Sequence, residues 1–193
     1  MLRWSLPFNS SIYRSKLYSY NIILKDEKII FGPDRNLGNY INSITGREMV
    51  LWDGACHVHE EFSLEKILEL KSKYPAAKVV VHPECKATVA EVADYVGSTA
   101  GILDYCGKDE ATEFIVVTEA GILAEMRRKY PEKSFIPAPP IGSACGCNEC
   151  KYMKMLTLES SVACLESESP EIVMDEKTRK SAERSILNMI AVK

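Results

Sequence analysis

Two short runs of apolar, β-branched residues constrain the fold of this chain more than any other feature. Residues 78–82 (KVVVH) and residues 114–117 (FIVV) have the length and composition of buried strands, and segments with helical periodicity precede and follow them. Strands that alternate with helices in this way are typical of α/β proteins with parallel sheets. In such sheets ligands collect at loops that leave the carboxyl ends of strands, so functional residues are expected there.

The hydrophobic pattern of the remaining sequence predicts further strands and helices before and after these two runs. Additional strands are predicted at residues 28–31, 48–52, 134–136 and 171–173. Helices are predicted at residues 37–43, 64–74, 121–129 and 157–166, around Val89 to Ala93, and from Asp175 onward. Ser63 and Thr157 stand where N-caps are needed, and Pro75 ends the helix that Ser63 opens.

The composition is that of a soluble globular protein and excludes some classes of function. Of the 193 residues, 46% are hydrophobic and 26% are charged, which suits one domain or two small ones. The net charge of −3 provides no basic face for nucleic-acid phosphates, and no apolar run is long enough to cross a bilayer. We therefore expect a cytoplasmic protein that binds neither nucleic acid nor membrane.

The first 25 residues differ from the rest of the chain, because they are basic, contain Ser and Tyr, and have no acid before Asp26. This composition is typical of organellar transit peptides, so targeting to an organelle stays open. The alternative, which we favour, is a non-native leader.

A weak internal repeat links two cysteine-containing loops. Cys56 is followed by residues 63–65 (SLE), and Cys150 is followed at the same offsets by residues 157–159 (TLE). A predicted strand and helix precede each cysteine, and a capped helix, a proline and a strand follow it. The sequence thus predicts a chain of repeated α/β units, the earlier of which is cut at its start.

The seven cysteines indicate metal chemistry rather than a disulfide framework, because their number is odd, their spacing is uneven and no secretory signal precedes them. Cys145, Cys147 and Cys150 form the densest group, in a glycine-containing loop of the kind that holds zinc or an iron–sulfur cluster. One or two of these thiols are expected to bind metal; the alternative is a loop of incidental cysteines. The isolated cysteines are expected to be small buried side chains: Cys85, Cys106 and Cys164.

All three histidines lie in short motifs that can carry chemistry. In residues 56–59 (CHVH), His59 can ligate metal or move protons, although the segment can equally be an exposed loop at the start of a helix. His82 and Glu84 follow a predicted strand, where they are well placed for acid–base work; the alternative is a strand end with a solvated carboxylate. Residues 97–99 (GST) offer hydroxyls and amides that can hold a carboxylate or phosphate.

Five stretches, in order and near the expected spacing, together resemble the quinolinate synthase family. They are residues 30–38 (IFGPDRNLG), 54–59 (GACHVH), 81–85 (VHPEC), 93–99 (ADYVGST) and 150–154 (CKYMK), the last followed by Leu158 and Glu159. The resemblance extends from about Glu27 to the C-terminus.

This resemblance implies α/β/α three-layer units arranged as a pseudo-threefold repeat, with one cluster cysteine from each. It implies a [4Fe–4S] cluster with one open iron that acts as a Lewis acid. The implied enzyme is a transferase of NAD biosynthesis that condenses iminoaspartate with dihydroxyacetone phosphate to give quinolinate. Carried over residue by residue, the cluster ligands are Cys56 and Cys150, and Cys145 and Cys147 are a candidate redox pair. The implied substrate-binding residues are His82, Pro83, Glu84, Ser98 and Thr99, and the implied catalytic residues are His82, Glu84 and His59.

The sequence departs from the family before about Glu27. The family's first domain and most of its second, with the first cluster cysteine, have no match here, so we interpret the chain as N-terminally truncated, with a separate chain as the candidate source of the missing domain. The predicted divisions are residues 1–26 as an unmatched leader, 27–56 as the remainder of the second domain, 57–150 as the third, and 151–193 as a C-terminal helical segment. Two alternatives stay open: a non-catalytic metal-binding or redox module on the Cys145–Cys147–Cys150 loop, and an inactive fragment.

Overall fold

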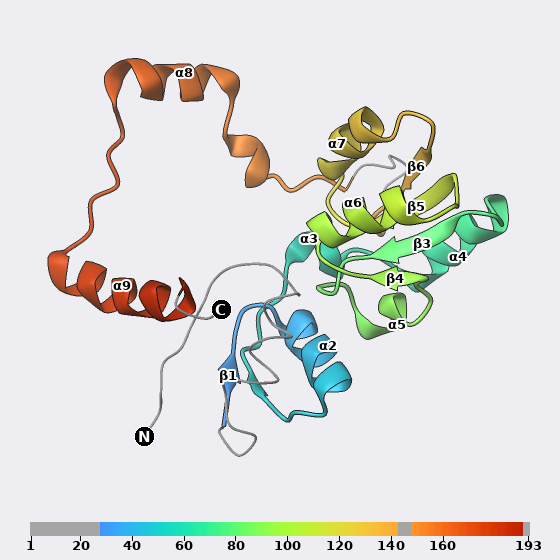
Figure 1. The fold of residues 1–193 in the computed structure, drawn as a ribbon, viewed down its shortest axis with the longest axis horizontal. Helices are drawn as coiled ribbons and strands as arrows, with labels where there is room; N and C mark the ends of the chain where they lie inside the picture. Colours follow the sequence, from blue (N-terminus) through green and yellow to red (C-terminus); the bar gives the residue numbers. More distant parts are fainter. Residues whose placement is uncertain (1–27, 143–147, 191–193) are drawn as a thin grey trace. The chain divides into compact units, whose positions relative to one another are not determined.

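The computed structural model describes residues 28–142 and 148–190, which fall into two units (Figure 1). The first unit ends at Lys151 and contains every strand of the described residues, so we call it the sheet unit. The second begins at Tyr152 and is built of helices joined by irregular segments; we call it the helical unit.

The centre of the sheet unit is a four-stranded parallel sheet with the strand order β4-β3-β5-β6. The strands are β3 (Lys78–Val81), β4 (Tyr95–Val96), β5 (Glu113–Val117) and β6 (Ser134–Pro137). Val81 stands beside Val96 on one side and beside Val117 on the other. The carboxyl ends of these strands therefore lie at one edge of the sheet, as the sequence predicts.

Helices cover both faces of this sheet and make three layers (Figure 1). Alternate residues of the two central strands face opposite ways, so Val81 and Val117 belong to one buried cluster while Val80 and Val116 belong to the other. The first cluster includes residues of α3 (His57–Glu60), α4 (Leu64–Lys73) and α5 (Ala87–Ala90). The second includes residues of α6 (Thr99–Lys108) and α7 (Ile122–Lys129). The predicted α/β class with parallel sheets is confirmed.

A smaller parallel pair precedes this sheet, formed by β1 (Ile30–Phe31) and β2 (Val50–Leu51) on either side of α2 (Arg35–Thr45). Asp34 caps α2 by accepting the backbone N–H of Leu37 at 3.0 Å. Gly46 ends the helix at φ 68°, a left-handed conformation that favours glycine. Cys56 follows this strand–helix–strand segment, as the predicted repeat requires.

The cap signals of the sequence are confirmed, whereas some element lengths are not. Ser63 accepts the backbone N–H of Lys66 at 3.2 Å and begins α4. Thr157 and Ser160 form a reciprocal capping box at the start of α8 (Leu158–Ser167). The helix predicted around Val89 is only the four-residue α5, which ends before Val92. The segment after Cys56 is the helical turn α3 rather than an exposed loop, because Val58 and His59 are buried.

The helical unit contains a short 3₁₀ turn (Met153–Met155), α8 and α9 (Glu176–Ile190). The strand predicted at residues 171–173 is wrong: Ile172 and Val173 are 93% and 81% exposed, and no described strand pairs with them. The prediction that Cys164 is buried is also wrong, since this thiol is exposed on α8, whereas Cys85 and Cys106 are buried. A β-branched or apolar residue is buried only where a neighbouring element covers it.

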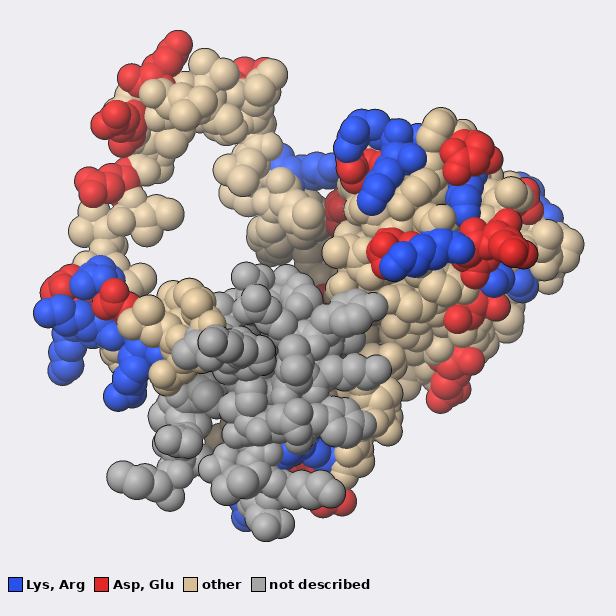
Figure 2. Space-filling view, in the orientation of Figure 1, with Lys and Arg blue, Asp and Glu red and all other residues tan. Residues whose placement is uncertain are grey.

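Charged side chains of both signs are intermixed over the face of the sheet unit seen in Figure 2. Many of them form short-range pairs along one helix, such as Lys108 with Asp104 on α6 and Arg128 with Glu125 on α7. In the described residues, no helix is both long enough and apolar enough to span a membrane.

The packing of α6 against the sheet predicts that the same substitution, Ile to Val, has different effects on stability at a buried and at an exposed position. Ile102 is fully buried, whereas Ile186 on α9 is 53% exposed. Ile102→Val should lower the free energy of unfolding by about 0.5–1.5 kcal/mol through the lost methylene and residual cavity. Ile186→Val should change it by less than about 0.5 kcal/mol. Urea titration measures both, and equal losses would contradict the assignment of Ile102 to the core.

The ion pair between Lys78 and Asp109 predicts a pH-dependent stability. Lys78 Nζ lies 2.6 Å from Asp109 Oδ2, and this ammonium, with the backbone N–H of Ala111, lowers the pKa of Asp109 from 3.8 to about 2. The folded state therefore favours the carboxylate, so the stabilisation is present above the ordinary pKa and is lost as pH falls through the folded one.

We expect Asp109→Asn to be less stable than the parent near neutral pH, with a difference that shrinks as the pH falls toward the lowered pKa of Asp109. Urea titrations over a series of pH values measure this difference. Asp104→Asn, which removes an exposed carboxylate from the same unit, is the control. A difference for Asp109→Asn that does not depend on pH would contradict the ion-pair explanation.

Candidate metal centre and active site

The carboxyl edge of the four-stranded sheet gathers polar residues from three strands. His82 follows β3 and donates its backbone N–H to the carbonyl of Val117 at 3.1 Å. Gly97 follows β4 and donates to the carbonyl of Val81 at 3.0 Å, and Thr118 follows β5. This register places the His82–Glu84 segment between the Ser98–Thr99 segment and Thr118.

The turn α3 brings Cys56 and His59 to the same edge. Cys56 begins this turn, and its side chain packs against the buried cluster under the sheet. Val58 is 2% exposed, and its carbonyl accepts the side-chain amide of the buried Asn148 at 2.7 Å. These contacts fix the turn, so that the His59 ring points into the unit rather than into solvent.

Cys56, His59 and Glu84 form a compact group whose donor atoms all lie within 4.8 Å of one another. His59 Nδ1 lies 3.1 Å from Glu84 Oε2, although the ring is not oriented to make a hydrogen bond there. His59 Nε2 lies 3.1 Å from the Thr118 hydroxyl. A thiol, an imidazole and a carboxylate at such spacing are groups that bind transition metals. The group is therefore a candidate metal centre.

The close approach of these groups shifts their pKa values toward the charged forms. Burial by itself would lower the pKa of His59, but the Cys56 thiol and the Glu84 carboxylate outweigh burial and raise it to about 9. The neighbouring His59 imidazole lowers the pKa of the Cys56 thiol, although burial of the thiol would raise it. Burial would raise the pKa of Glu84, but His59 and His82 lower it. The thiolate and the carboxylate are thus favoured beside a protonated imidazole.

The pKa of His82 is shifted in the opposite direction to that of His59, toward the neutral form. Its ring stacks on that of His59, with centroids 4.4 Å apart and planes 13° from parallel. Burial and the neighbouring His59 lower the pKa of His82 to about 4, so its neutral form is favoured near pH 7. Its Nδ1 accepts the backbone N–H of Glu84 at 3.4 Å, which leaves Nε2 to carry the proton. His82 is thus a neutral hydrogen-bond donor beside a charged pair.

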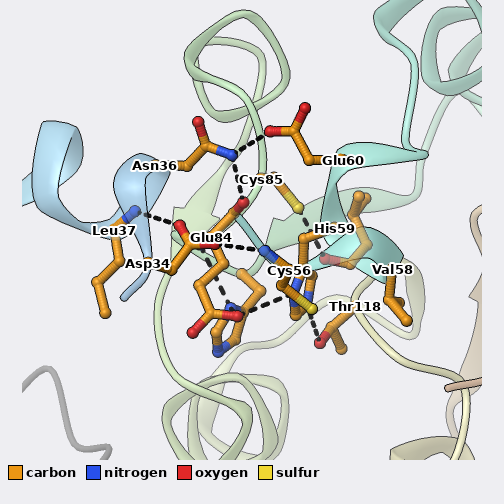
Figure 3. A network of polar contacts seen from close by, with 12 residues as sticks. Asp34, Asn36, Leu37, Cys56, Val58, His59, Glu60, Glu84, Cys85 and Thr118 are labelled. Atoms are coloured by element: carbon orange, nitrogen blue, oxygen red, sulfur yellow. Dashed lines mark hydrogen bonds and ion pairs between the residues drawn. The ribbon is translucent and has the colours of Figure 1, made fainter. Parts of the chain in front are cut away.

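A network from the β1–α2 segment supports the group from the other side (Figure 3). Asp34 Oδ2 accepts the backbone N–H of Cys56 at 2.6 Å. Asn36 donates to Glu60 Oε1 at 2.5 Å and to the backbone carbonyl of Glu84 at 2.9 Å. One short segment therefore holds the backbone of both Cys56 and Glu84.

Cys150 is tied to the loop after β5. Its backbone N–H donates to Glu119 Oε1 at 3.1 Å, and the backbone N–H of Ala120 donates to the carbonyl of Asn148 at 3.0 Å. Cys150 is half-buried and packs against the same cluster as Cys56. Both cysteines that the resemblance marks as cluster ligands therefore border one core.

The other predicted site residues divide into two groups. Pro83 is buried between His82 and Glu84, Ser98 caps α6 by accepting the N–H of Gly101 at 3.2 Å, and Thr99 is exposed at the start of that helix. Cys145 and Cys147, the candidate redox pair, lie outside the described residues.

Several residues of the site escape the sequence analysis. Thr118 follows the buried β5 as His82 follows β3, so the rule that selects His82 would also select Thr118. Asp34 and Asn36 lie in the IFGPDRNLG stretch but carry no motif that points to Cys56 or Glu84. Asn148 and Glu119 have no sequence signal of their own, because their partners are distant in the chain.

The fold and the site define a class of protein, namely an α/β/α protein with a thiol–imidazole–carboxylate centre at the carboxyl edge of a parallel sheet. Residues 16–191 match the model of the NadA family, which is described as quinolinate synthetase A protein. The chain therefore belongs to this family.

Curated relatives named quinolinate synthase support this assignment. The protein of Chloroherpeton thalassium is 48% identical over 168 residues, which cover 87% of this chain and 52% of the relative. That of a Synechocystis species is 50% identical over 167 residues, with 86% and 52% covered. That of Microcystis aeruginosa is 49% identical over 170 residues, with 88% and 53% covered. The chain spans about half the length of these relatives.

The contact between His59 and Thr118 predicts a stability change. Thr118→Val keeps the side-chain shape but removes the hydroxyl that faces Nε2 of His59 in a buried position. Because the ring nitrogen loses its partner, the free energy of unfolding should fall by about 1–3 kcal/mol. Thr118→Ser, which keeps the hydroxyl, should recover part of the loss. Urea titration compares the three proteins, and a Thr118→Val protein as stable as the parent would refute the contact.

Proposed function

We propose that this chain carries part of the active site of a quinolinate synthase, the enzyme that condenses iminoaspartate with dihydroxyacetone phosphate to quinolinate. The convergence of Cys56, His59 and Glu84 at the carboxyl edge of the sheet carries this proposal. The activity, the substrates and any separate chain that completes the site are part of the proposal.

Two of the described cysteines, Cys56 and Cys150, fit the role of ligands in the [4Fe–4S] cluster that the resemblance implies. Cys56 would be one ligand, because His59 lowers the pKa of its thiol and the thiolate is the form that binds iron. Cys150 would be another, because it borders the same core and its loop is fixed by Glu119. When bound, such a cluster with an open iron supplies a Lewis acid for substrate oxygens.

The residues beside Cys56 would hold and move protons. The raised pKa of His59 and the lowered pKa of Glu84 favour the proton on the imidazole, so His59 would donate a proton and Glu84 would accept one. His82, neutral and protonated on Nε2, would orient a substrate carboxylate or carbonyl by donating a hydrogen bond. The His59 ring is buried, and the His82 side chain is 14% exposed, so both rings have limited contact with solvent.

The start of α6 would bind an anionic part of the substrate. Ser98 and Thr99 provide hydroxyls, and the first turn of a helix presents backbone N–H groups toward an anion. Iminoaspartate carries carboxylates and dihydroxyacetone phosphate carries a phosphate, so either substrate has a group for this position.

Anaerobic reconstitution with iron and sulfide tests the proposal. The parent chain should bind iron and show the electron paramagnetic resonance signal of a reduced [4Fe–4S] cluster, and Cys56→Ala and Cys150→Ala should each lose most of the iron. Cys164→Ala is the control, because Cys164 is exposed on α8 in the helical unit. Iron and sulfide analysis, with spectra of all four proteins, measures the outcome.

A parent chain without bound iron would overturn the proposed cluster. A cluster that is indifferent to Cys56 would instead favour the alternative of a local metal or redox module at the Cys145–Cys147–Cys150 loop. A cluster that depends on both cysteines would justify an assay of quinolinate formation.

A further inference from the structure

Two carboxylates each hold the backbone N–H of one candidate cluster cysteine. Asp34 Oδ2 accepts the N–H of Cys56 at 2.6 Å, and Glu119 Oε1 accepts the N–H of Cys150 at 3.1 Å. The second oxygen of each carboxylate is also occupied by a backbone donor. Asp34 Oδ1 accepts the N–H of Leu37 at 3.0 Å, and Glu119 Oε2 accepts the N–H of Gly121 at 2.7 Å.

The two arrangements have the same order along the chain. In the first, β1 is followed by Asp34, α2, β2 and Cys56; in the second, β5 is followed by Glu119, α7, β6 and Cys150. In both, the acidic residue follows the first strand, binds a backbone N–H at or near the start of the helix, and accepts the backbone N–H of a cysteine that lies after the second strand. The carboxylates thus repeat with the α/β unit itself.

We propose that Asp34 and Glu119 are positioning residues that orient Cys56 and Cys150 and lower the reduction potential of the cluster these cysteines bind. This inference rests on the proposed function, because it needs a cluster on the two cysteines. It gives Asp34 and Glu119 a role in positioning the metal ligands, although neither residue is itself proposed as a ligand.

The proposed effect on the potential has two physical causes. Backbone N–H groups near cluster sulfurs stabilise the reduced, more negative cluster when they donate to sulfur, and hydrogen bonding and local charge are among the factors that set the potential. Here the N–H of each cysteine is committed to a carboxylate instead of sulfur. Each carboxylate also places negative charge beside its cysteine, which opposes the uptake of an electron.

Conservative variants separate this role from that of a helix cap. Asn is as good an N-cap as Asp, so Asp34→Asn can still accept the N–H of Leu37 while its amide group faces the N–H of Cys56. Asp34→Ser also keeps a capping oxygen but lacks the second acceptor. Glu119→Gln likewise retains one acceptor for its two donors.

The experiment uses the full chain reconstituted anaerobically with iron and sulfide. It measures the midpoint potential of the cluster by redox titration followed by electron paramagnetic resonance, and the rate at which a chelator removes iron. Asp34→Asn, Asp34→Ser and Glu119→Gln should each shift the midpoint potential to more positive values. Each should also lose iron faster, by about tenfold, as expected when a residue that supports a ligand is removed.

Two variants control for charge and for folding. Glu125→Gln and Asp104→Asn each remove one negative charge from the sheet unit where it pairs with a cation on the same helix, and each should leave the midpoint potential and iron loss close to those of the parent. Urea titration of the metal-free proteins identifies any variant that loses iron because it folds poorly. For such a variant, the midpoint potential of the cluster that remains bound is used in place of the iron loss to test the role of the carboxylate.

The outcomes distinguish this inference from the proposed function. Unchanged potentials and iron loss in all three variants, with a cluster present in the parent, would overturn the role of Asp34 and Glu119 and leave the proposed function intact. Equal shifts in the control variants would also overturn it, because general charge would then explain the effect. A parent chain that binds no iron would overturn both.

Discussion

The parallel pairing of β3 with β5 is the interaction on which the candidate site depends. The register that aligns Val81 with Val117 brings His82, Glu84 and Thr118 to one edge of the sheet. Both strands are buried on both faces, so a shift of one residue would exchange the side chains of the two core clusters. The packing of the core therefore fixes the geometry of groups that themselves contribute little to it.

The geometry of the site buries charged groups, which destabilises the folded protein. The side chains of His59 and Glu84, whose charged forms are favoured, lie largely out of water, where the desolvation of each ion is expensive. Their mutual attraction, the Cys56 thiol and the Thr118 hydroxyl offset that cost in part. The imidazole nitrogen that approaches Glu84 without a hydrogen bond shows that the offset is incomplete among the described residues. Such incompletely satisfied groups are common where a ligand or metal is to be bound.

The order of strand, acidic residue, helix, strand and cysteine occurs twice in the sheet unit. The structure thus gives a physical basis to the weak sequence repeat: the acidic residue and the cysteine are distant in the chain but meet because the helix returns the chain to the same edge. The repeat does not continue past the second cysteine in the same form, since residues 171–173, predicted as its following strand, pair with no strand of the described residues, and Ile172 and Val173 are exposed.

The sequence by itself determined the α/β class, most helix starts, and the residues of the CHVH and HPE motifs, because periodicity, caps and short motifs are local properties. The family followed from the same local stretches. Only the tertiary structure decided that His59 lies between Glu84 and Thr118, that His82 stacks on it, and that Asp34 reaches Cys56. It also decided that Cys164 is exposed while Cys106 is buried. These outcomes depend on which distant elements cover a residue, and an isolated stretch of sequence carries no record of its neighbours in space.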